Sequence, residues 1–182
     1  MPGFTIHIAV AKEYAKKHPK EIRDVDEFIK GSIAPDNISL ENSNIDKNIT
    51  HYGKWGKGET QTYIDAFLKD AKVDMQSDYW KGYFMHLLTD HCFYNICFRK
   101  ELEEEQRTHH GFYYDYDCLN KELLKKYHIE IMENIKKYMS CTEGKPRYLN
   151  IDKVIKFIDN MSNINLEEQE ELIKQKGMEG IK

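Results

Sequence analysis

The sequence lacks the hydrophobic segments that carry a chain into or across a membrane. Its first twenty residues have neither the charged start nor the apolar core, about 7–15 residues long, of a secretory signal peptide. No run reaches the roughly 18 apolar residues of a membrane span. The most apolar stretch, residues 79–98, is interrupted by Lys81, His86, Asp90 and Asn95. These absences predict a cytoplasmic protein without a membrane span.

Paired cysteines and concentrated positive charge are also absent. The 4 cysteines include no CxxC pair, so we expect reduced thiols rather than a zinc knuckle or a disulfide framework. The 27 Lys and Arg residues are interspersed with 31 Asp and Glu residues, and the net charge is −4. Without a basic stripe, binding of extended nucleic acid is not expected, and an anionic ligand would need a local binding device.

The composition is that of a globular protein with one domain. A chain of 182 residues with 40% hydrophobic and 32% charged residues can bury a substantial core. Strand-like alternation is absent and apolar residues recur at helical spacing, so residues 1–182 are predicted to form a single all-α helical bundle. The last helices, at about 150–176, carry no chemical motif; they would complete the bundle, form a peripheral appendage or provide a homo-oligomer surface.

The helix boundaries follow from caps and breakers. A helix from Asp24 or Asp26 should end at Ile33, because the residue before Pro35 avoids the α region. Residues 36–59, rich in Asn, Ser and Gly, are predicted to form a long functional loop, after which Thr60 opens another helix. The longest helix, at about 78–104, is apolar around most of its circumference and belongs in the middle of the bundle. Further helices are expected at 5–17, 115–126, 128–140, 151–162 and 165–175.

The first chemical signal is the pair His86 and Asp90 on this central helix. At positions i and i+4 their side chains project from one face. Burying an ionised carboxylate is costly unless a partner charge or a metal compensates, and imidazole with carboxylate is a natural chelate. A His–Asp hydrogen bond inside the bundle explains the pair equally well. His91, turned about 100° away around the helix, is expected in the core or behind the site.

Other candidate ligands are scattered along the first half of the chain. His7 lies among apolar residues of the first helix, Asp36 follows Ala34-Pro35, and His51 lies in the long loop. Each has a simpler interpretation, as a core histidine, a turn aspartate or a solvated loop residue. The order His, Asp, His, His-x-x-x-Asp is far more specific than any one of them.

With these residues in MPGFTIH, GSIAPD, THYGKW and WKGYFMHLLTD, the chain resembles the zinc-dependent phospholipase C family and the related fungal single-strand-specific nucleases. It is most similar to short bacterial members without a secretion signal. The resemblance covers roughly residues 1–120 and implies a helical bundle that hydrolyses phosphate esters with up to three zinc ions. It implies that Asp36, His51, His86 and Asp90 hold one zinc, and that Asp90 bridges to another ion bound by His7.

The chain departs from the family pattern after Asp90. The family's next histidine ligand has no counterpart, since Ile96 and its neighbours stand there, and no later His-x-x-x-Glu/Asp pair exists. Replacement ligands would come from the THHGFYYDYD segment. The candidates are Asp115, Asp117, His109 and His110, although an aspartate at a helix start is as often an N-cap. Two zinc ions are therefore expected, with manganese or iron as alternatives.

The predicted function is hydrolysis of a small phosphodiester or phosphomonoester. Paired metal ions activate a water for attack on phosphorus, and Asp36 would orient or deprotonate that water. Tyr52, Trp55 and Tyr114 would wall the substrate pocket, although packing explains these aromatic residues as well. The alternatives are a cytosolic nuclease or nucleotide hydrolase, and a non-catalytic helical binding module stabilised by metal.

Overall fold

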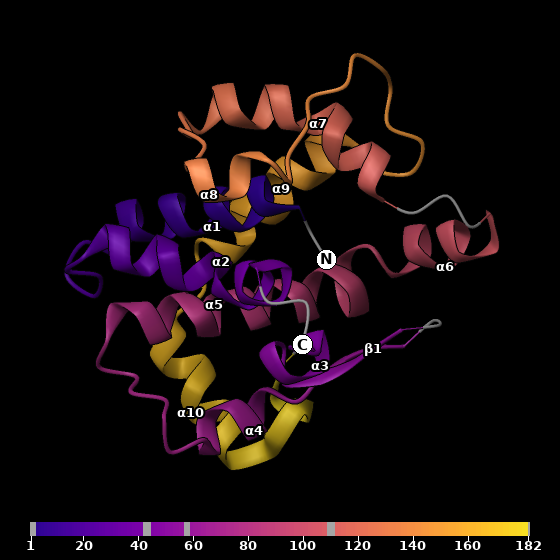
Figure 1. The fold of residues 1–182 in the computed structure, drawn as a ribbon. Helices are drawn as coiled ribbons and strands as arrows, with labels where there is room; N and C mark the ends of the chain where they lie inside the picture. The colour runs from indigo at the N-terminus through magenta and orange to yellow at the C-terminus, as the bar shows by residue number, and fades with distance from the viewer. Residues whose placement is uncertain (1–2, 42–44, 57–58, 109–111, 182) are drawn as a thin grey trace.

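The computed structural model describes residues 3–41, 45–56, 59–108 and 112–181 and confirms the all-α prediction (Figure 1). Over these residues the only strands are β1 (Gly53–Gly56) and β2 (Glu59–Thr62), an antiparallel pair in which Trp55 lies opposite Thr60. The helices are α1 (Phe4–Lys17), α2 (Val25–Glu41), α3 (Lys47–Thr50), α4 (Ile64–Lys69), α5 (Asp78–Cys92), α6 (Arg99–Thr108), α7 (Tyr113–Lys126), α8 (Glu133–Lys136), α9 (Ile151–Met161) and α10 (Leu166–Lys176), with a π-helical turn η1 (Phe93–Cys97) and a 3₁₀ turn η2 (Gly177–Gly180).

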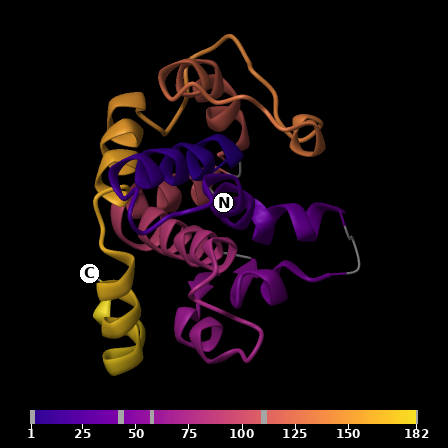
Figure 2. The ribbon, with the colours of Figure 1, turned by 90° about the vertical axis from the view of Figure 1, so that its left-hand side faces the viewer.

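Helix α5 runs through the middle of the molecule, as its apolar circumference predicts. Residues 82–90 are all buried, so the helix exposes no face along this stretch. In Figures 1 and 2, α1 and α2 lie on one side of α5, and α4 and α10 lie on the other. No helix among the described residues is long and apolar enough to cross a lipid bilayer. The helix that carries His86 and Asp90 is therefore enclosed by protein.

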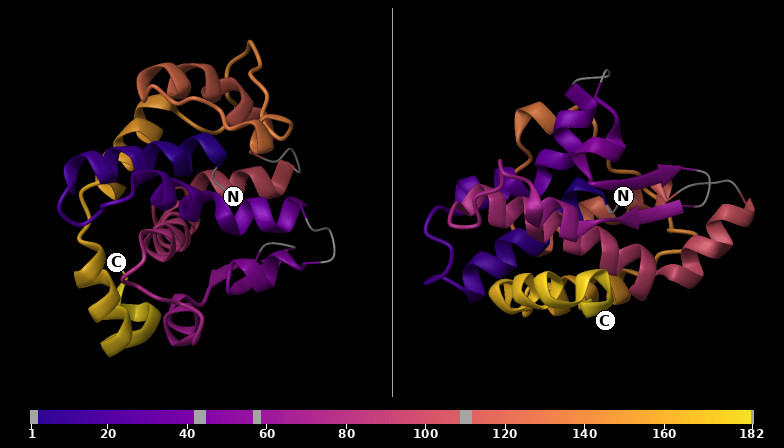
Figure 3. Two further views of the ribbon diagram at one scale, coloured as in Figure 1. Left: turned by 60° about the vertical axis from the view of Figure 1, so that its left-hand side comes forward. Right: turned by 90° about the horizontal axis from the view of Figure 1, so that it is seen from below.

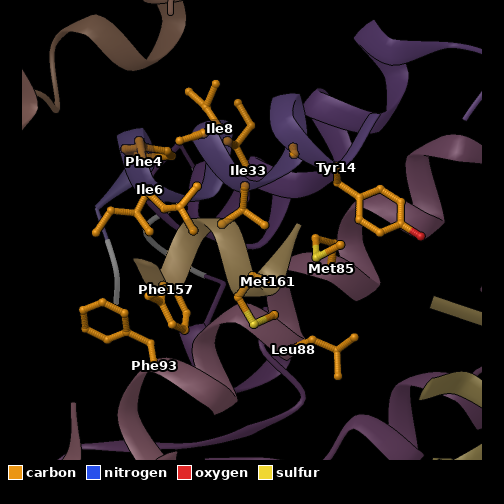
Figure 4. Packing of buried hydrophobic residues seen from close by; sticks show 14 of the residues in the cluster. Phe4, Ile6, Ile8, Tyr14, Ile33, Met85, Leu88, Phe93, Phe157 and Met161 are labelled. Carbon is orange, nitrogen blue, oxygen red and sulfur yellow. The ribbon is translucent and has the colours of Figure 1, made fainter. Parts of the chain in front are cut away.

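The hydrophobic core joins both ends of the chain. Figure 4 shows Phe4, Ile6 and Ile8 of α1 near Phe157 and Met161 of α9. All of these side chains belong to one buried cluster, which also takes in Leu166 and Ile173 of α10. Helices α7, α9 and α10 confirm the predictions for 115–126, 151–162 and 165–175. The late helices thus contribute to the same core as the first one (Figure 3).

Glycines let α2 and α5 approach each other at backbone distance. A Cβ atom on Gly82 would lie 2.0 Å from the carbonyl oxygen of Phe28, and one on Gly31 would lie 1.9 Å from the carbonyl oxygen of Tyr79. Real Cβ atoms do not approach backbone oxygens so closely, so both positions require glycine. The close contact places the second half of α2 directly beside His86.

The prediction that Pro35 ends the second helix is wrong, since α2 continues to Glu41 with Pro35 inside it. Proline removes one backbone donor and its ring presses on the preceding turn, at a cost of about 3 kcal/mol. Burial of Phe28 and Ile33 in the core, together with the glycine contact to α5, offsets this cost. Asp36 therefore projects from a helix rather than from a turn.

The predicted loop at 36–59 is also wrong in most of its length. Its first part belongs to α2, and its second part forms α3 and β1. Thr60 lies in β2, so the following helix begins later, at Ile64. Strands this short give no alternation that could be read, and the hairpin owes its stability to packing beside α5. The 128–140 segment contains only the short helix α8.

The long helix predicted at 78–104 is divided by the π-helical turn η1. Helix α5 ends at Cys92, η1 follows, and α6 begins at Arg99. A π turn inserts an extra residue and rotates the chain, which shifts the direction of the side chains beyond it. The turn begins three residues after Asp90. The helix is regular where it carries the candidate ligands and irregular immediately after them.

Substitution of Gly82 tests the backbone contact. Gly82→Ala should lower the free energy of unfolding by at least about 2 kcal/mol, because a methyl group meets a fixed carbonyl rather than a flexible side chain. It should also weaken zinc binding, because His86 lies one turn further along α5. Urea unfolding and zinc titration measure both effects. Gly177→Ala is the control: its φ of +62° makes alanine strained, but no atom lies within 4 Å, so zinc binding should not change. Equal zinc affinity in all three proteins would contradict the expectation.

Candidate metal centre

Four segments of the chain bring the predicted ligands together in one buried cluster. His7 comes from α1, Asp36 from α2, His51 from the end of α3, and His86 and Asp90 from α5. Each of these residues is at most 1% exposed. The five residues that the sequence singled out by their order therefore meet at one place in the fold.

The side-chain atoms of His51, His86, Asp36 and Asp90 stand at the separations of metal ligands. His51 Nε2 lies 2.9 Å from Asp36 Oδ1, 3.3 Å from His86 Nε2 and 3.8 Å from Asp90 Oδ2. His86 Nε2 lies 3.6 Å from Asp90 Oδ2 and 3.9 Å from Asp36 Oδ1. Ligands at about 2.0–2.1 Å around a tetrahedral zinc are about 3.3 Å apart, which falls within this range.

Backbone carbonyls fix the orientation of both imidazoles. The Nδ1 atom of His86 lies 2.8 Å from the carbonyl oxygen of Ser32, and that of His51 lies 3.1 Å from the carbonyl oxygen of Lys47. A carbonyl only accepts, so Nδ1 of His86 carries the proton and donates. Nδ1 of His51 also lies 2.8 Å from the Thr50 hydroxyl oxygen; since that hydroxyl donates to the Lys47 carbonyl, the His51 Nδ1–H can donate to both oxygens. In the neutral rings, each Nε2 is then a lone pair directed into the cluster. This is the arrangement in which protein imidazoles bind metals.

The cluster therefore gathers acceptors without a donor among them. Two lone-pair nitrogens face each other and face two carboxylates, and a buried set of this kind needs a cation at its centre. The cation is either a proton on one imidazole or a metal ion. A metal satisfies all of the acceptors at once, whereas one proton bridges a single pair. The donor set and its spacing fit a divalent ion with nitrogen and oxygen preference.

Asp90 faces two sides of the cluster with its two oxygens. Its Oδ2 faces His86 and His51, while its Oδ1 lies 3.3 Å from His7 Nε2. The His7 ring stacks on the His86 ring with centroids 3.9 Å apart. Among the described residues, neither nitrogen of His7 and neither oxygen of Asp90 has a partner in hydrogen-bond geometry. Buried polar atoms without partners are rare, and these atoms fit a further cation between His7 and Asp90.

Burial and mutual charge set the ionisation of the cluster. Burial lowers the pKa of His7 to about 4, an effect that the neighbouring His86 reinforces, so His7 is neutral near pH 7. Burial alone would raise the pKa of Asp36, but His86 and His51 outweigh it and lower that pKa to about 2. Burial lowers the pKa of His51. For His86, burial is outweighed by Asp90 and Asp36, so its pKa is raised. The carboxylates are ionised, as metal ligation requires.

Asp115 has a structural role instead of the predicted ligand role. It is fully buried, and its carboxylate accepts hydrogen bonds from the backbone N–H groups of Arg147, Tyr148 and Leu149 at 2.7–2.8 Å. Neither is it the N-cap, since α7 begins two residues earlier, at Tyr113. Charge-assisted bonds of this kind tie the segment before α9 to α7. The ligand groups formed by the described residues do not include it.

Of the other candidate ligands, Asp117 does not join the cluster, and two lie outside the described residues. Asp117 lies on α7 and takes no part in the ligand groups formed by the described residues. His109 and His110 lie outside the described residues, as does the side chain of Trp55. The hydroxyl of Tyr52 donates to Asp70, and the Tyr114 ring lies against the guanidinium of Arg147. These contacts favour a packing role for Tyr52 and Tyr114 and not the predicted role in the wall of a substrate pocket. His91 lies near Asn95, outside the cluster.

Sequence patterns alone miss the groups that orient the ligands. The carbonyl of Ser32 positions His86, and that of Lys47 positions His51. A backbone carbonyl leaves no mark in composition or spacing. For Lys47 a signal does exist, because it precedes His51 by one helical turn.

No protein-family model, curated protein or solved structure matches this chain. The resemblance to the phospholipase C family is therefore supported only by the order of the sequence motifs. The candidate metal centre is supported by the distances between its side-chain atoms.

Zinc binding tests the centre directly. Zinc added to chelator-treated protein should bind with at least one ion per chain and should raise the melting temperature, because the ligands converge only in the folded state. Asp90→Asn keeps the volume of the side chain but should weaken zinc binding by at least about 100-fold. Asp117→Asn, a carboxylate change outside the cluster, is the matched control. Less than one ion per chain, with no change in melting temperature, would rule the centre out.

The chelator-treated protein should lose stability as the pH falls. His7 binds a proton near pH 6.5 when unfolded but only near pH 4 when folded, so acid favours the unfolded state in this interval. Between pH 6.5 and 4.5 the contribution of His7 should fall by about 2 kcal/mol. Urea unfolding of wild type and His7→Gln across this interval measures it, with exposed His128→Asn as the control.

The contribution of His86 to the free energy of unfolding has the opposite sign, because its raised pKa favours the folded state below pH 6.5. Wild type and both variants contain His86, so this contribution is common to all three proteins. Identical pH slopes for wild type and His7→Gln would show that His7 is not held neutral by burial.

Proposed function

We propose that this chain is a metal-dependent phosphoester hydrolase of the phospholipase C type, with zinc as its metal and manganese or iron as alternatives. The observation that carries the proposal is the convergence of His7, Asp36, His51, His86 and Asp90 from separate segments into one buried centre. Convergence of residues that the sequence singled out by motif order is not expected of unrelated core histidines. The substrate is a small phosphodiester or phosphomonoester, in keeping with the negative net charge.

The residues divide into two ligand groups that share α5. Asp36, His51, His86 and Asp90 would hold one ion, and His7 with the other oxygen of Asp90 would hold a second. Nitrogen and carboxylate donors suit zinc. The carbonyls of Ser32 and Lys47 keep Nε2 of both imidazoles available, so the ligand atoms need no rearrangement before an ion binds.

When bound, zinc supplies Lewis acidity and a water of lowered pKa for attack on phosphorus. The protein supplies position and proton transfer. Asp36, whose Oδ1 lies 2.9 Å from Nε2 of the fellow ligand His51, would orient the attacking water and accept its proton. The surrounding core excludes bulk water, which strengthens electrostatic interactions within the site. In this scheme Asp36 acts both as a ligand and as the general base.

One observation favours a second function, a non-catalytic binding module in which the metal is structural. Structural zinc sites use four protein ligands and are closed, whereas catalytic sites keep one position open. Here four side chains surround one position and all of them are at most 1% exposed. In such a module zinc would raise stability without supporting any reaction.

Hydrolysis of bis(4-nitrophenyl) phosphate separates the two functions. The zinc-loaded protein should hydrolyse this diester, a chelator should abolish the reaction, and Asp36→Asn should lower kcat by about 10²–10⁴-fold through loss of the general base. Asp117→Asn serves as the control and should leave kcat unchanged. If zinc raises the melting temperature but no phosphoester in a broad panel is turned over with zinc, manganese or iron, the structural module is correct and the hydrolase is not.

A further inference from the structure

His51 is the ligand of the candidate metal centre that depends most on contacts from other elements. The other four ligands project from α1, α2 and α5, which have 14, 17 and 15 residues. His51 instead follows α3, which has 4 residues and ends at Thr50. A helix of this length has little stability of its own, so its direction is set by what packs against it and bonds to it.

Tyr83 of α5 holds the residue directly before His51. Its hydroxyl donates a hydrogen bond to the carbonyl oxygen of Thr50, and only 5% of Tyr83 is exposed. This carbonyl lies at the end of α3, where the last carbonyl groups have no partner within the helix. Tyr83 precedes the ligand His86 by about one helical turn. Helix α5 therefore carries ligands of its own and, through Tyr83, also secures the end of α3 from which His51 projects.

Tyr52, the residue directly after His51, has a left-handed backbone conformation. Its φ of 46° is unfavourable for a residue with a bulky side chain, and such a conformation persists only where surrounding contacts impose it. The Tyr52 hydroxyl donates to Asp70 Oδ2 at 2.6 Å, and the Tyr52 carbonyl accepts from the backbone N–H of Tyr63 at 2.6 Å. These two bonds maintain the turn through which the chain passes from His51 into β1.

The ring of Phe67 connects the contacts on the two sides of His51. This ring, fully buried in α4, stacks on the Tyr83 ring with centroids 5.4 Å apart. It also meets the Tyr52 ring in an edge-on contact with centroids 5.4 Å apart. Tyr52 and Tyr83 thus share one packing partner, and the residues before and after His51 are held by one group of aromatic side chains.

We propose that Tyr83 and Tyr52 are positioning residues that hold the His51 imidazole in the direction a tetrahedral ion requires, and thereby give the centre a preference for zinc over manganese. This role rests on the proposed function, because it takes the centre to bind a metal, but it does not require turnover. Zinc takes four ligands in tetrahedral directions, whereas manganese suits oxygen ligands in octahedral coordination, which water can complete. Loss of one fixed imidazole therefore costs zinc more than manganese.

Tyr83→Phe tests the role, because it removes the hydroxyl and retains the ring. Competition titrations should show zinc affinity lowered by about 10-fold or more, as when a group that orients a metal ligand is lost, and manganese affinity changed by less than about 3-fold. Cobalt(II) absorbs visible light more strongly in tetrahedral than in octahedral coordination, so its band should weaken in the variant. Tyr52→Phe, which removes the bond to Asp70, should change both measurements in the same direction but less.

Tyr14→Phe is the matched control. Tyr14 is also fully buried and its hydroxyl donates to Glu21 at 2.7 Å, but it lies on α1 two turns beyond His7, outside the centre. This variant should lower stability and leave zinc binding unchanged. Wild-type zinc affinity with an unchanged cobalt band in Tyr83→Phe overturns the positioning role. Equal losses for zinc and manganese, or an equal zinc loss in Tyr14→Phe, also overturn it, because the effect is then one of stability.

Two further outcomes separate the positioning role from the proposed function. If Tyr83→Phe does not fold, Tyr52→Phe decides, and wild-type zinc affinity in that variant overturns the role. Metal binding with the expected variant effects, but without turnover of any ester, supports the role and counts against the hydrolase. Wild-type protein that binds no metal overturns both.

Discussion

Burial of two carboxylates with three imidazoles is the constraint on which the rest of the structure depends. Asp36 and Asp90 are ionised inside the protein, and taking such charges out of water costs several kcal/mol each unless a cation compensates. The two imidazoles closest to both carboxylates turn lone pairs, not protons, toward them when neutral. The charge of the cluster is therefore balanced either by a proton on an imidazole or by a metal ion, and its geometry matches the ligand spacing of a tetrahedral metal.

The fold holds these groups with backbone features rather than with side chains. Gly31 and Gly82 bring α2 and α5 into direct contact, which puts the carbonyl of Ser32 within reach of the His86 ring. Helix α2 continues through Pro35, so Asp36 keeps a fixed direction. Immediately beyond Asp90 the regular helix gives way to the π turn η1. Each feature costs local stability, and the surrounding core offsets it.

The closure of the candidate metal centre and its unsatisfied polar atoms favour different proposed functions. Four surrounding ligands with almost no exposure are typical of a structural metal. The unsatisfied atoms of His7 and the second oxygen of Asp90 add capacity that a single structural ion would not use. These atoms favour the two-ion centre of the proposed hydrolase over a site for one structural ion.

The sequence by itself determined the helical class, the central position of α5 and the candidates His7, Asp36, His51, His86 and Asp90. Periodicity and residue chemistry are local properties, and these predictions needed nothing else. Tertiary structure alone decided that α2 passes through Pro35, that a hairpin follows α3, and that Asp115 anchors a loop rather than a metal. In each case packing or hydrogen bonding with a distant segment outweighed a local preference of a few kcal/mol. The distances that turn scattered histidines into a candidate metal centre likewise exist only once the helices have packed.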